Sequence, residues 1–240
     1  MESTAHIALS RQMVLSRQME VIAHNVANAT ASGFKAEALL LEPVAVDAGA
    51  RQRLAFVQDV GMVRDLDPGP ITTTGNPLDL AIEGPGYFTI ETAEGVRYGR
   101  SGQFRLNEEG ELATPDGDPV LDDGGATLAL PVDAGPIAIA ADGTVSSGAG
   151  VVGRIELVTF EDQQRLRKVG NGLYRADQPA QPAPAAHLVQ GALEGSNVAP
   201  IIEMTRMMAT VRAYQGTQRL LDTHHELQRR AIERMLEATG

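Results

Sequence analysis

Residues 201–236 read IIEMTRMMATVRAYQGTQRLLDTHHELQRRAIERML, and this stretch is the strongest structural signal in the chain. Its positions recur with alternating steps of three and four, which is the spacing of a coiled-coil seam. The seam positions are Met204, Met207, Val211, Tyr214, Gln218, Leu221, His225, Gln228, Ile232 and Met235. Because seven of these ten are apolar, the stretch predicts one long helix that needs a packing partner.

The N-terminal end of the chain predicts a second helix, from about Thr4 to Asn28. Four apolar residues form a single helical stripe: Leu15, Met19, Ile22 and Val26. The polar sequence that follows loosens the helix, because short polar side chains bond the local backbone. We expect Gly33 to end this helix in the left-handed conformation, with Phe34 making the apolar contact that accompanies such a turn.

The middle of the chain is rich in turn-forming residues, whereas the two ends are not. All 13 prolines lie between residues 43 and 200, and 23 of the 25 glycines lie between residues 33 and 195. Short apolar runs between these residues predict antiparallel strands. The predicted strands are Tyr87–Glu91, Val96–Tyr98, Phe104–Leu106, Leu112–Thr114, Ile155–Phe160 and His187–Gln190. Residues 178–186 are a run of Pro, Ala and Gln and are interpreted as a linker.

Together these signals predict an α+β fold. The N- and C-terminal helices pack as a coiled-coil-like pair, and a mainly antiparallel β domain is inserted between them. The predicted helical domain comprises residues 1–35 and 196–240, and the predicted β domain comprises residues 36–195.

Composition excludes several classes of function. The net charge of −11 argues against a nucleic-acid-binding surface and against attraction to anionic lipid. The chain has no Cys, so it has no disulfides and no thiolate chemistry. No apolar run is long enough to span a membrane. Because Glu2 and Arg11 flank no apolar core, the N-terminus does not resemble a cleavable secretory signal.

Three patterns that could carry chemistry have simpler interpretations. Residues 148–153 match G-x-G-x-x-G, but a strand-like sequence follows instead of the helix that a dinucleotide site needs. His224 and His225 are adjacent, so on a helix they point about 100° apart and cannot share one metal ion. Carboxylates are abundant among turn residues, as at Asp116, Asp118, Asp122 and Asp123, where acids are usually solvated turn formers. We therefore predict no enzyme activity, no catalytic residue, no cofactor and no metal.

Four motifs, in order along the chain, resemble those of the bacterial flagellar rod and hook proteins. Residues 23–35, AHNVANATASGFK, are similar to the family's A-N-N-x-A-N-x-x-T-x-G-F-K, with His24 and Ala31 as departures. Residues 75–88, GNPLDLAIEGPGYF, look like its N-x-L-D-x-A-I-x-G-x-G-F-F. Residues 98–104, YGRSGQF, resemble its Y-T-R-x-G-x-F. The last motif comprises residues 193–198, LEGSNV, with Glu203 and residues 212–214, RAY.

The resemblance implies a structural subunit of the flagellar basal body, exported through the type III apparatus without a cleaved signal. Such subunits polymerise in the periplasm, with copies of themselves and with other rod subunits, into the hollow drive shaft that transmits motor torque and carries exported subunits. The short span between Lys35 and Thr72 favours the proximal part of the rod. The alternatives are a distal rod subunit, a hook-type subunit, or an accessory protein that acts on the cell wall.

The predicted functional residues follow from the helical stripes and from this resemblance. The predicted assembly interface consists of Leu15, Met19, Ile22, Asn25, Val26, Asn28, Met204, Met207, Val211, Tyr214 and Leu221. The predicted structural turns contain Gly33, Phe34, Gly84 and Gly86.

Overall fold

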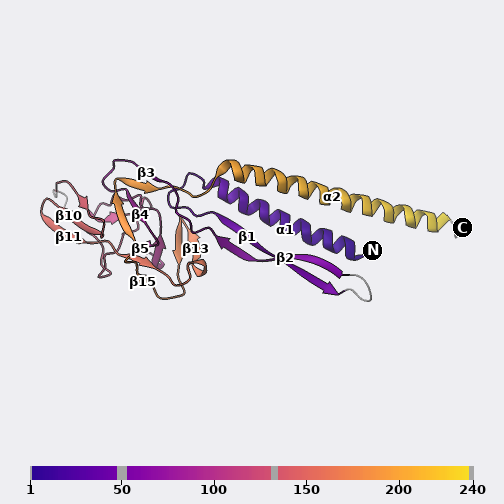
Figure 1. Cartoon of the computed structure of the whole chain (residues 1–240), viewed down its shortest axis with the longest axis horizontal. Coiled ribbons are helices and arrows are strands. Elements are labelled where there is room, and N and C mark those ends of the chain that lie inside the picture. The colour runs from indigo at the N-terminus through magenta and orange to yellow at the C-terminus, as the bar shows by residue number, and fades with distance from the viewer. Residues whose placement is uncertain (1, 48–52, 131–134, 238–240) are drawn as a thin grey trace. The chain divides into compact units, whose positions relative to one another are not determined.

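The computed structural model describes residues 2–47, 53–130 and 135–237 (Figure 1). Two long helices, α1 (Glu2–Ala27) and α2 (Pro200–Glu237), stand at the two ends of the chain, and strands occupy the middle. The predicted α+β fold, with antiparallel strands inserted between two terminal helices, is therefore confirmed. The seam positions Ile232 and Met235 lie within α2, but their side chains are outside the described part of the structure.

The chain divides into two compact units. The helical unit comprises residues 1–27, 37–65 and 199–240, and the β unit comprises residues 28–36 and 66–198. The division predicted from sequence differs from this grouping in two respects. It assigned residues 37–65 to the β domain, whereas in the structure these residues pack with the helices. It also assigned residues 28–35 and 196–198 to the helical domain, whereas they group with the β unit.

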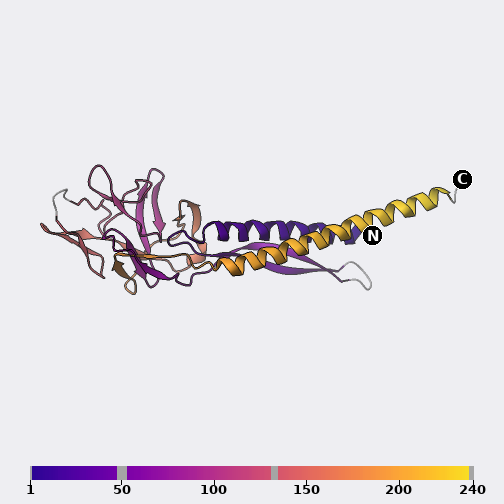
Figure 2. The same ribbon diagram turned by 90° about the horizontal axis from the view of Figure 1, so that it is seen from above.

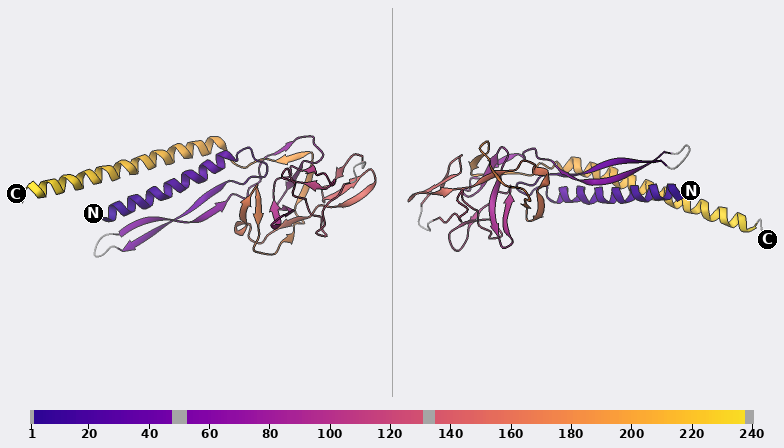
Figure 3. Two further views of the ribbon diagram at one scale, coloured as in Figure 1. Left: turned by 180° about the vertical axis from the view of Figure 1, so that it is seen from behind. Right: turned by 90° about the horizontal axis from the view of Figure 1, so that it is seen from below.

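In the helical unit, α1 lies between α2 and a long β-hairpin (Figures 1 and 3). The hairpin pairs β1 (Glu37–Asp47) with β2 (Arg53–Arg64), and its register shifts once, between Leu40 and Leu41. The two helices run antiparallel, since Asn25 bonds Glu203 near one end of the pair and Gln12 bonds Gln218 further along. With 38 residues against 26, α2 extends past the start of α1 (Figure 2).

The buried face of α2 is rotated by one residue from part of the predicted seam. Met207, Tyr214, Leu221 and Gln228 are half-buried, as the seam predicts. Of the alternate predicted positions, 204, 218 and 225 are exposed and only 211 is half-buried. The residue before each of them is more buried: these are Glu203, Thr210, Thr217 and His224, and the first three are less than 9% exposed.

The polar side chains in this seam are tolerated because their hydrogen bonds are made locally. The hydroxyls of Thr210 and Thr217 donate to the carbonyls of Arg206 and Ala213, one turn earlier, at 2.9 and 3.0 Å. Burial of a bonded hydroxyl costs far less than burial of an unbonded one. Polar residues can thus fill part of the buried seam, while an apolar residue of the predicted seam, Met204, lies on the exposed surface.

The β unit is built from short antiparallel strands. Their bounds are β3 Ile71–Thr73, β4 Leu80–Glu83, β5 Tyr87–Thr92, β6 Gly95–Gly99, β7 Arg105–Leu106, β8 Leu112–Ala113, β9 Ala138–Ile139, β10 Thr144–Ser147, β11 Gly150–Arg154, β12 Leu157–Thr159, β13 Arg167–Gly170, β14 Leu173–Arg175, β15 Gln181–Pro182, β16 His187–Gln190 and β17 Ala192–Glu194. The largest sheet has the order β13-β14-β6-β5-β12-β15, and a three-stranded sheet has the order β11-β10-β9. Two-stranded pairs β16-β4, β17-β3 and β7-β8 complete the unit.

Two clusters of buried side chains form the core of the β unit. The larger one surrounds Phe88 and Phe104, whose rings meet edge to face at 4.9 Å between centroids. The smaller one is aromatic and is organised around Tyr87, which packs against Phe160 and Tyr174. Edge-to-face ring pairs add stability beyond the area that they bury. The β unit thus has a self-contained core.

The segment interpreted as a linker, residues 178–186, is part of this core, so that interpretation was wrong. Gln181 and Pro182 form the edge strand β15, which pairs with β12. Ala183 and Ala186 are buried in the larger cluster. Proline is accepted here because an edge position requires no backbone donor on its outer side.

The predicted conformation of Gly33 is confirmed, with φ = +67°, but its predicted role as a helix cap was wrong. The helix α1 ends at Ala27, well before Gly33. Gly33 packs instead against the backbone at Arg100, where an added Cβ would lie 2.5 Å from the carbonyl carbon. Phe34 likewise does not close the helix. It is buried in the β unit, with the Lys168 ammonium 4.4 Å from its ring centroid.

Candidate assembly site

Large apolar side chains are exposed along both terminal helices. On α2, Ile201 is 81% exposed and Leu227 is 60% exposed, and on α1, Met13 is 67% exposed. Further exposed apolar residues on the helices are Leu9, Ile202, Met204, Met208 and Leu220. Scattered exposed apolar residues are ordinary, but their concentration on two helices of one unit is typical of an interaction surface.

The structure divides the predicted interface residues into three groups. Leu15, Ile22 and Asn25 are buried within the chain. Met19, Val26, Asn28, Met207, Val211, Tyr214 and Leu221 are half-buried, and Met204 is exposed. All of them except Asn28, which belongs to the β unit, lie in the helical unit. The buried group therefore holds the helical unit together, and the exposed side chains remain available to other molecules.

Asn25 joins three elements of the helical unit through one side-chain amide. Its Nδ2 donates to the carbonyl of Glu37 at 2.8 Å and to the Glu203 carboxylate at 3.3 Å. Its Oδ1 accepts from the backbone N–H of Glu37 at 3.0 Å. Since Asn25 is only 2% exposed, it connects the end of α1, the start of the hairpin and the first turn of α2 without access to water.

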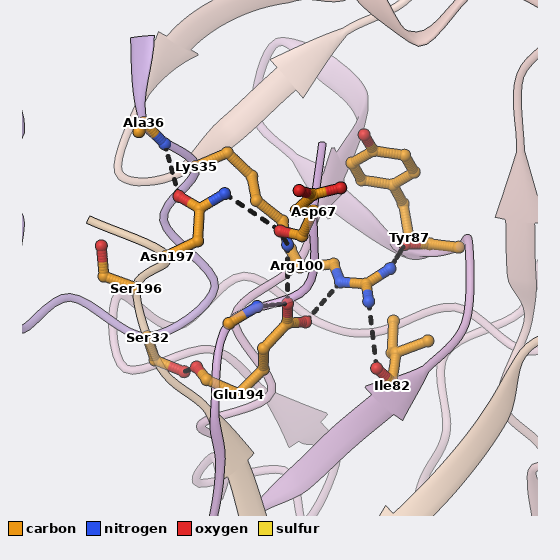
Figure 4. A network of polar contacts seen from close by, with 12 residues as sticks. Ser32, Lys35, Ala36, Asp67, Ile82, Tyr87, Arg100, Glu194, Ser196 and Asn197 are labelled. Atoms are coloured by element: carbon orange, nitrogen blue, oxygen red, sulfur yellow. Dashed lines mark hydrogen bonds and ion pairs between the residues drawn. The ribbon is translucent and has the colours of Figure 1, made fainter. Parts of the chain in front are cut away.

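A buried ionic cluster lies in the β unit, centred on Glu194 (Figure 4). Its carboxylate accepts from the Lys35 ammonium at 2.7 Å, from the N–H of Gly69 at 3.0 Å and from the Arg100 guanidinium. Arg100 also donates to the carbonyls of Gly86 and Ile82, at 2.7 and 3.0 Å. Buried charges are stable only when they are paired and fully hydrogen-bonded, and this cluster meets both conditions.

The charge state of Glu194 follows from these contacts. Burial acts to raise the pKa of its carboxyl, but the opposite charge of Arg100 and the hydrogen bonds from Lys35, Arg100 and Gly69 outweigh burial. The net result is a pKa below the ordinary value of 4.5, so the carboxylate is ionised at neutral pH.

Glu194 also holds the segment 32–35 through its backbone. Its carbonyl accepts from the N–H of Gly33 at 2.8 Å and from the hydroxyl of Ser32 at 3.0 Å. On the same segment, Lys35 donates a second bond, to the carbonyl of Asp67 at 2.8 Å. The first and last segments of the β unit are therefore fastened to each other at a single residue.

This cluster was not predicted from the sequence, although its parts were visible there. Lys35, Arg100 and Glu194 come from the first, third and fourth of the motifs described above, and the second motif supplies Ile82 and Gly86. The motifs themselves do not indicate that residues so far apart in sequence meet in one place. The predicted turn residues lie close by: Gly84 has φ = +97° and faces the backbone of Ala185, and Gly86 presents its carbonyl to Arg100.

The patterns considered for other chemistry have structural roles. Residues 148–153 lie in the hairpin of β10 and β11, as the glycine-rich interpretation predicts. The carboxylate of Asp122 accepts from the N–H groups of Gly124 and Ala126, which confirms its role in a turn. Within the described residues, no three His, Asp or Glu side chains converge as a metal site would require.

No helix that the structure describes combines the length and apolarity needed to cross a membrane.

Comparison with known proteins agrees with this architecture. Residues 81–147 match the family of the flagellar hook protein FlgE/F/G D1 domain, and residues 189–234 match that of the flagellar basal body rod FlgEFG protein C-terminal region. The chain belongs to the family of flagellar basal-body rod proteins, as its motifs predicted.

The relatives that it matches extend over nearly its full length. It is 41% identical to the flagellar basal-body rod protein FlgF of Caulobacter vibrioides, across 98% of each chain. It is 36% identical to FlgF of Mesorhizobium japonicum, across 92% of each chain. It is 33% identical to the rod protein FlgG of Bacillus subtilis, across 88% of this chain and 90% of that protein.

Proposed function

We propose that the chain is a subunit of the proximal part of the flagellar rod and that it assembles through the outward faces of α1 and α2. The observation that carries this proposal is the exposure of large apolar side chains on both helices, after their common seam has been filled. Removal of such side chains from water is the main driving force of protein association. Contacts of this kind that do not close on themselves generate a helical filament.

The proposal has further parts. The subunit works in the periplasm with copies of itself and with other rod subunits, and the type III apparatus exports it without cleavage. We expect it to have no enzymatic role, and the buried Lys35, Arg100 and Glu194 form structural ion pairs. The predicted interface residues act in two ways: the buried ones shape the helical unit and the exposed ones meet neighbours.

The distal rod is the second candidate, because the chain also matches a FlgG protein at 33% identity. The proximal assignment rests on the higher identity to FlgF proteins and on the short segment that joins residues 35 and 72. Imaging of purified basal bodies from cells that lack the gene distinguishes the two. Loss of the rod from its base supports the proximal assignment, and a rod that lacks only its outer part supports the distal one.

A single surface substitution tests the proposed interface. Met208 is 53% exposed, so Met208→Asp should leave the isolated chain folded. In the rod, the same change would bury an unpaired charge, which costs several kcal/mol. We expect loss of swimming in soft agar and loss of the subunit from purified basal bodies.

Val151→Asp is the matched control. Val151 is 74% exposed and lies on β11 in the β unit, so the same chemical change there should preserve swimming. If the Met208→Asp cells swim normally, the proposed interface is wrong. A peptidoglycan-digestion assay of the purified chain tests the cell-wall alternative, which requires that the chain digest peptidoglycan.

A further inference from the structure

An open apolar groove lies between α1 and α2, and its lining includes a glycine that the chain itself does not explain. The groove has a volume of about 360 Å³ and is lined by Ile7, Ala8, Arg11, Ala213, Gly216, Thr217 and Leu220. On the usual share of about 30 Å³ per molecule, about a dozen waters would fill it in the isolated chain.

Gly216 lies in the interior of α2, where glycine is less stable than alanine. A glycine in a helix is often explained by another part of the chain that approaches too closely for a side chain. That explanation fails here, because a Cβ built on Gly216 would meet nothing within 4 Å. The space above Gly216 is therefore available to a group from outside the chain.

The same helical unit carries side chains suited to this space. Met13 and Leu9 are 67% and 52% exposed, and they lie one turn apart on α1. On the helix they point about 100° and 140° away from Ala8, which is 4% exposed and lines the groove. One molecule thus presents exposed apolar side chains and an apolar groove on different faces of the same unit, an arrangement that suits a heterologous contact that propagates.

Charge does not oppose such a contact. The helical unit contains 11 basic and 12 acidic residues, so it is close to neutral. The β unit contains 9 basic and 19 acidic residues, a net charge of −10. Two copies can therefore approach through their helical units with little repulsion, whereas contact through their β units would bring like charges together.

We infer that the Gly216 groove receives the Met13 and Leu9 side chains of a second copy of this chain. The inference rests on the proposed function, because it specifies which surfaces of two rod subunits meet. The contact also explains why glycine occupies position 216, because the absence of a side chain there lets the helix of the neighbouring copy pack closely.

Cysteine cross-linking in basal bodies tests this pairing, and the absence of natural cysteines makes the products unambiguous. Cells produce two differently tagged copies, one with Met13→Cys and the other with Leu220→Cys, and isolated basal bodies are treated with a short bis-maleimide. We expect a cross-linked species that carries both tags. The control pair combines Met13→Cys with Gln215→Cys, which lies on another flank of α2, and should give at least tenfold less product.

Substitution of Gly216 is a second test of the proposed contact. Gly216→Ala should preserve the cross-link, whereas Gly216→Leu should reduce it at least tenfold by filling the groove. Helicity measured by circular dichroism should be undiminished in both variants, because a Cβ at position 216 meets nothing within 4 Å and both alanine and leucine favour a helix more than glycine does. An undiminished cross-link in the Gly216→Leu variant would overturn the inference.

Two further outcomes separate the inference from the proposed function. If Leu220→Cys does not cross-link to Met13→Cys but does cross-link to a cysteine introduced into a different rod subunit, the chain is a rod protein but the occupant of the groove is not a second copy. If the unmodified chain is absent from basal bodies, the proposed function itself fails.

Discussion

Glu194 is the residue at the centre of the buried ionic cluster of the β unit. It is 1% exposed, and its carboxylate pairs with both Lys35 and Arg100 in the cluster of Figure 4. The two cations also donate to backbone carbonyls, Lys35 to that of Asp67 and Arg100 to those of Ile82 and Gly86. Loss of the carboxylate would therefore remove the buried negative charge that both cations share.

We expect Glu194→Gln to lower the free energy of unfolding of the β unit by roughly 3–5 kcal/mol at pH 7, the usual effect of removing one partner of a buried ion pair. Chemical denaturation followed by circular dichroism measures this change. Glu161→Gln, at an exposed site in the same unit, should have almost no effect.

The effect should also depend on pH. The pKa of Glu194 is lowered on folding, so its charge stabilises the folded state fully above the unfolded value of 4.5. This contribution disappears as the pH falls through the lower pKa of the folded state. The difference between the unmodified chain and the Gln variant should therefore be constant from pH 7 to about pH 5 and should narrow in more acidic solution. A difference that stays constant into strong acid would contradict this account.

At the scale of the element, α2 shows how far an apolar pattern predicts burial. The three-and-four spacing predicted the helix, its length and half of its seam correctly. The other half is one residue out of register, because the buried polar residues form local hydrogen bonds that spacing alone does not reveal. Met204 satisfied the same apolar pattern, although it is exposed and lies outside the seam.

A pair of neighbouring substitutions tests the observed register. Thr217→Val removes a hydroxyl that bonds back to its own helix and places an apolar group in the seam, so we expect a gain of roughly 0.5–1 kcal/mol. Gln218→Val introduces a similar group on the exposed face and should give no gain. Thermal unfolding of the purified chain measures both, and a gain only for Gln218→Val would support the register predicted from the sequence.

At the scale of the whole molecule, the chain crosses between its two units three times, after residues 27, 36 and 65, before it returns to the helical unit at residue 199. Composition and motifs predicted two terminal helices around a β region, because glycine and proline mark the change in structure. They did not predict that the hairpin of β1 and β2 packs on α1, since strand-forming residues do not indicate which unit a strand joins. Nor did they predict the Glu194 cluster, which depends on contacts across 159 positions of sequence.

The division into units predicts which fragment folds alone. A fragment in which residues 28–36 are joined by a short Gly-Ser linker to residues 66–198 keeps Lys35, Arg100 and Glu194 together, and we expect cooperative thermal unfolding. Residues 36–190 alone retain both clusters of buried side chains but lack Lys35 and Glu194, so Arg100 loses its carboxylate partner. We expect that fragment to be less stable by at least ~3 kcal/mol, and equal stability of the two fragments would show that the cluster is dispensable.

The way Glu194 is bound has a mechanical consequence. Its carboxylate accepts a bond from Lys35, and its carbonyl accepts bonds from Gly33 and Ser32. The segment 32–35 and the segment that contains Glu194 are therefore joined by several hydrogen bonds that all meet at one residue. A pull that slides one segment along the other loads these bonds together, as in shear, and they must rupture as a group. A pull that peeled the segments apart would break them one at a time at much lower force. The β unit of a shaft protein is thereby secured against tension at the point where its chain enters and leaves.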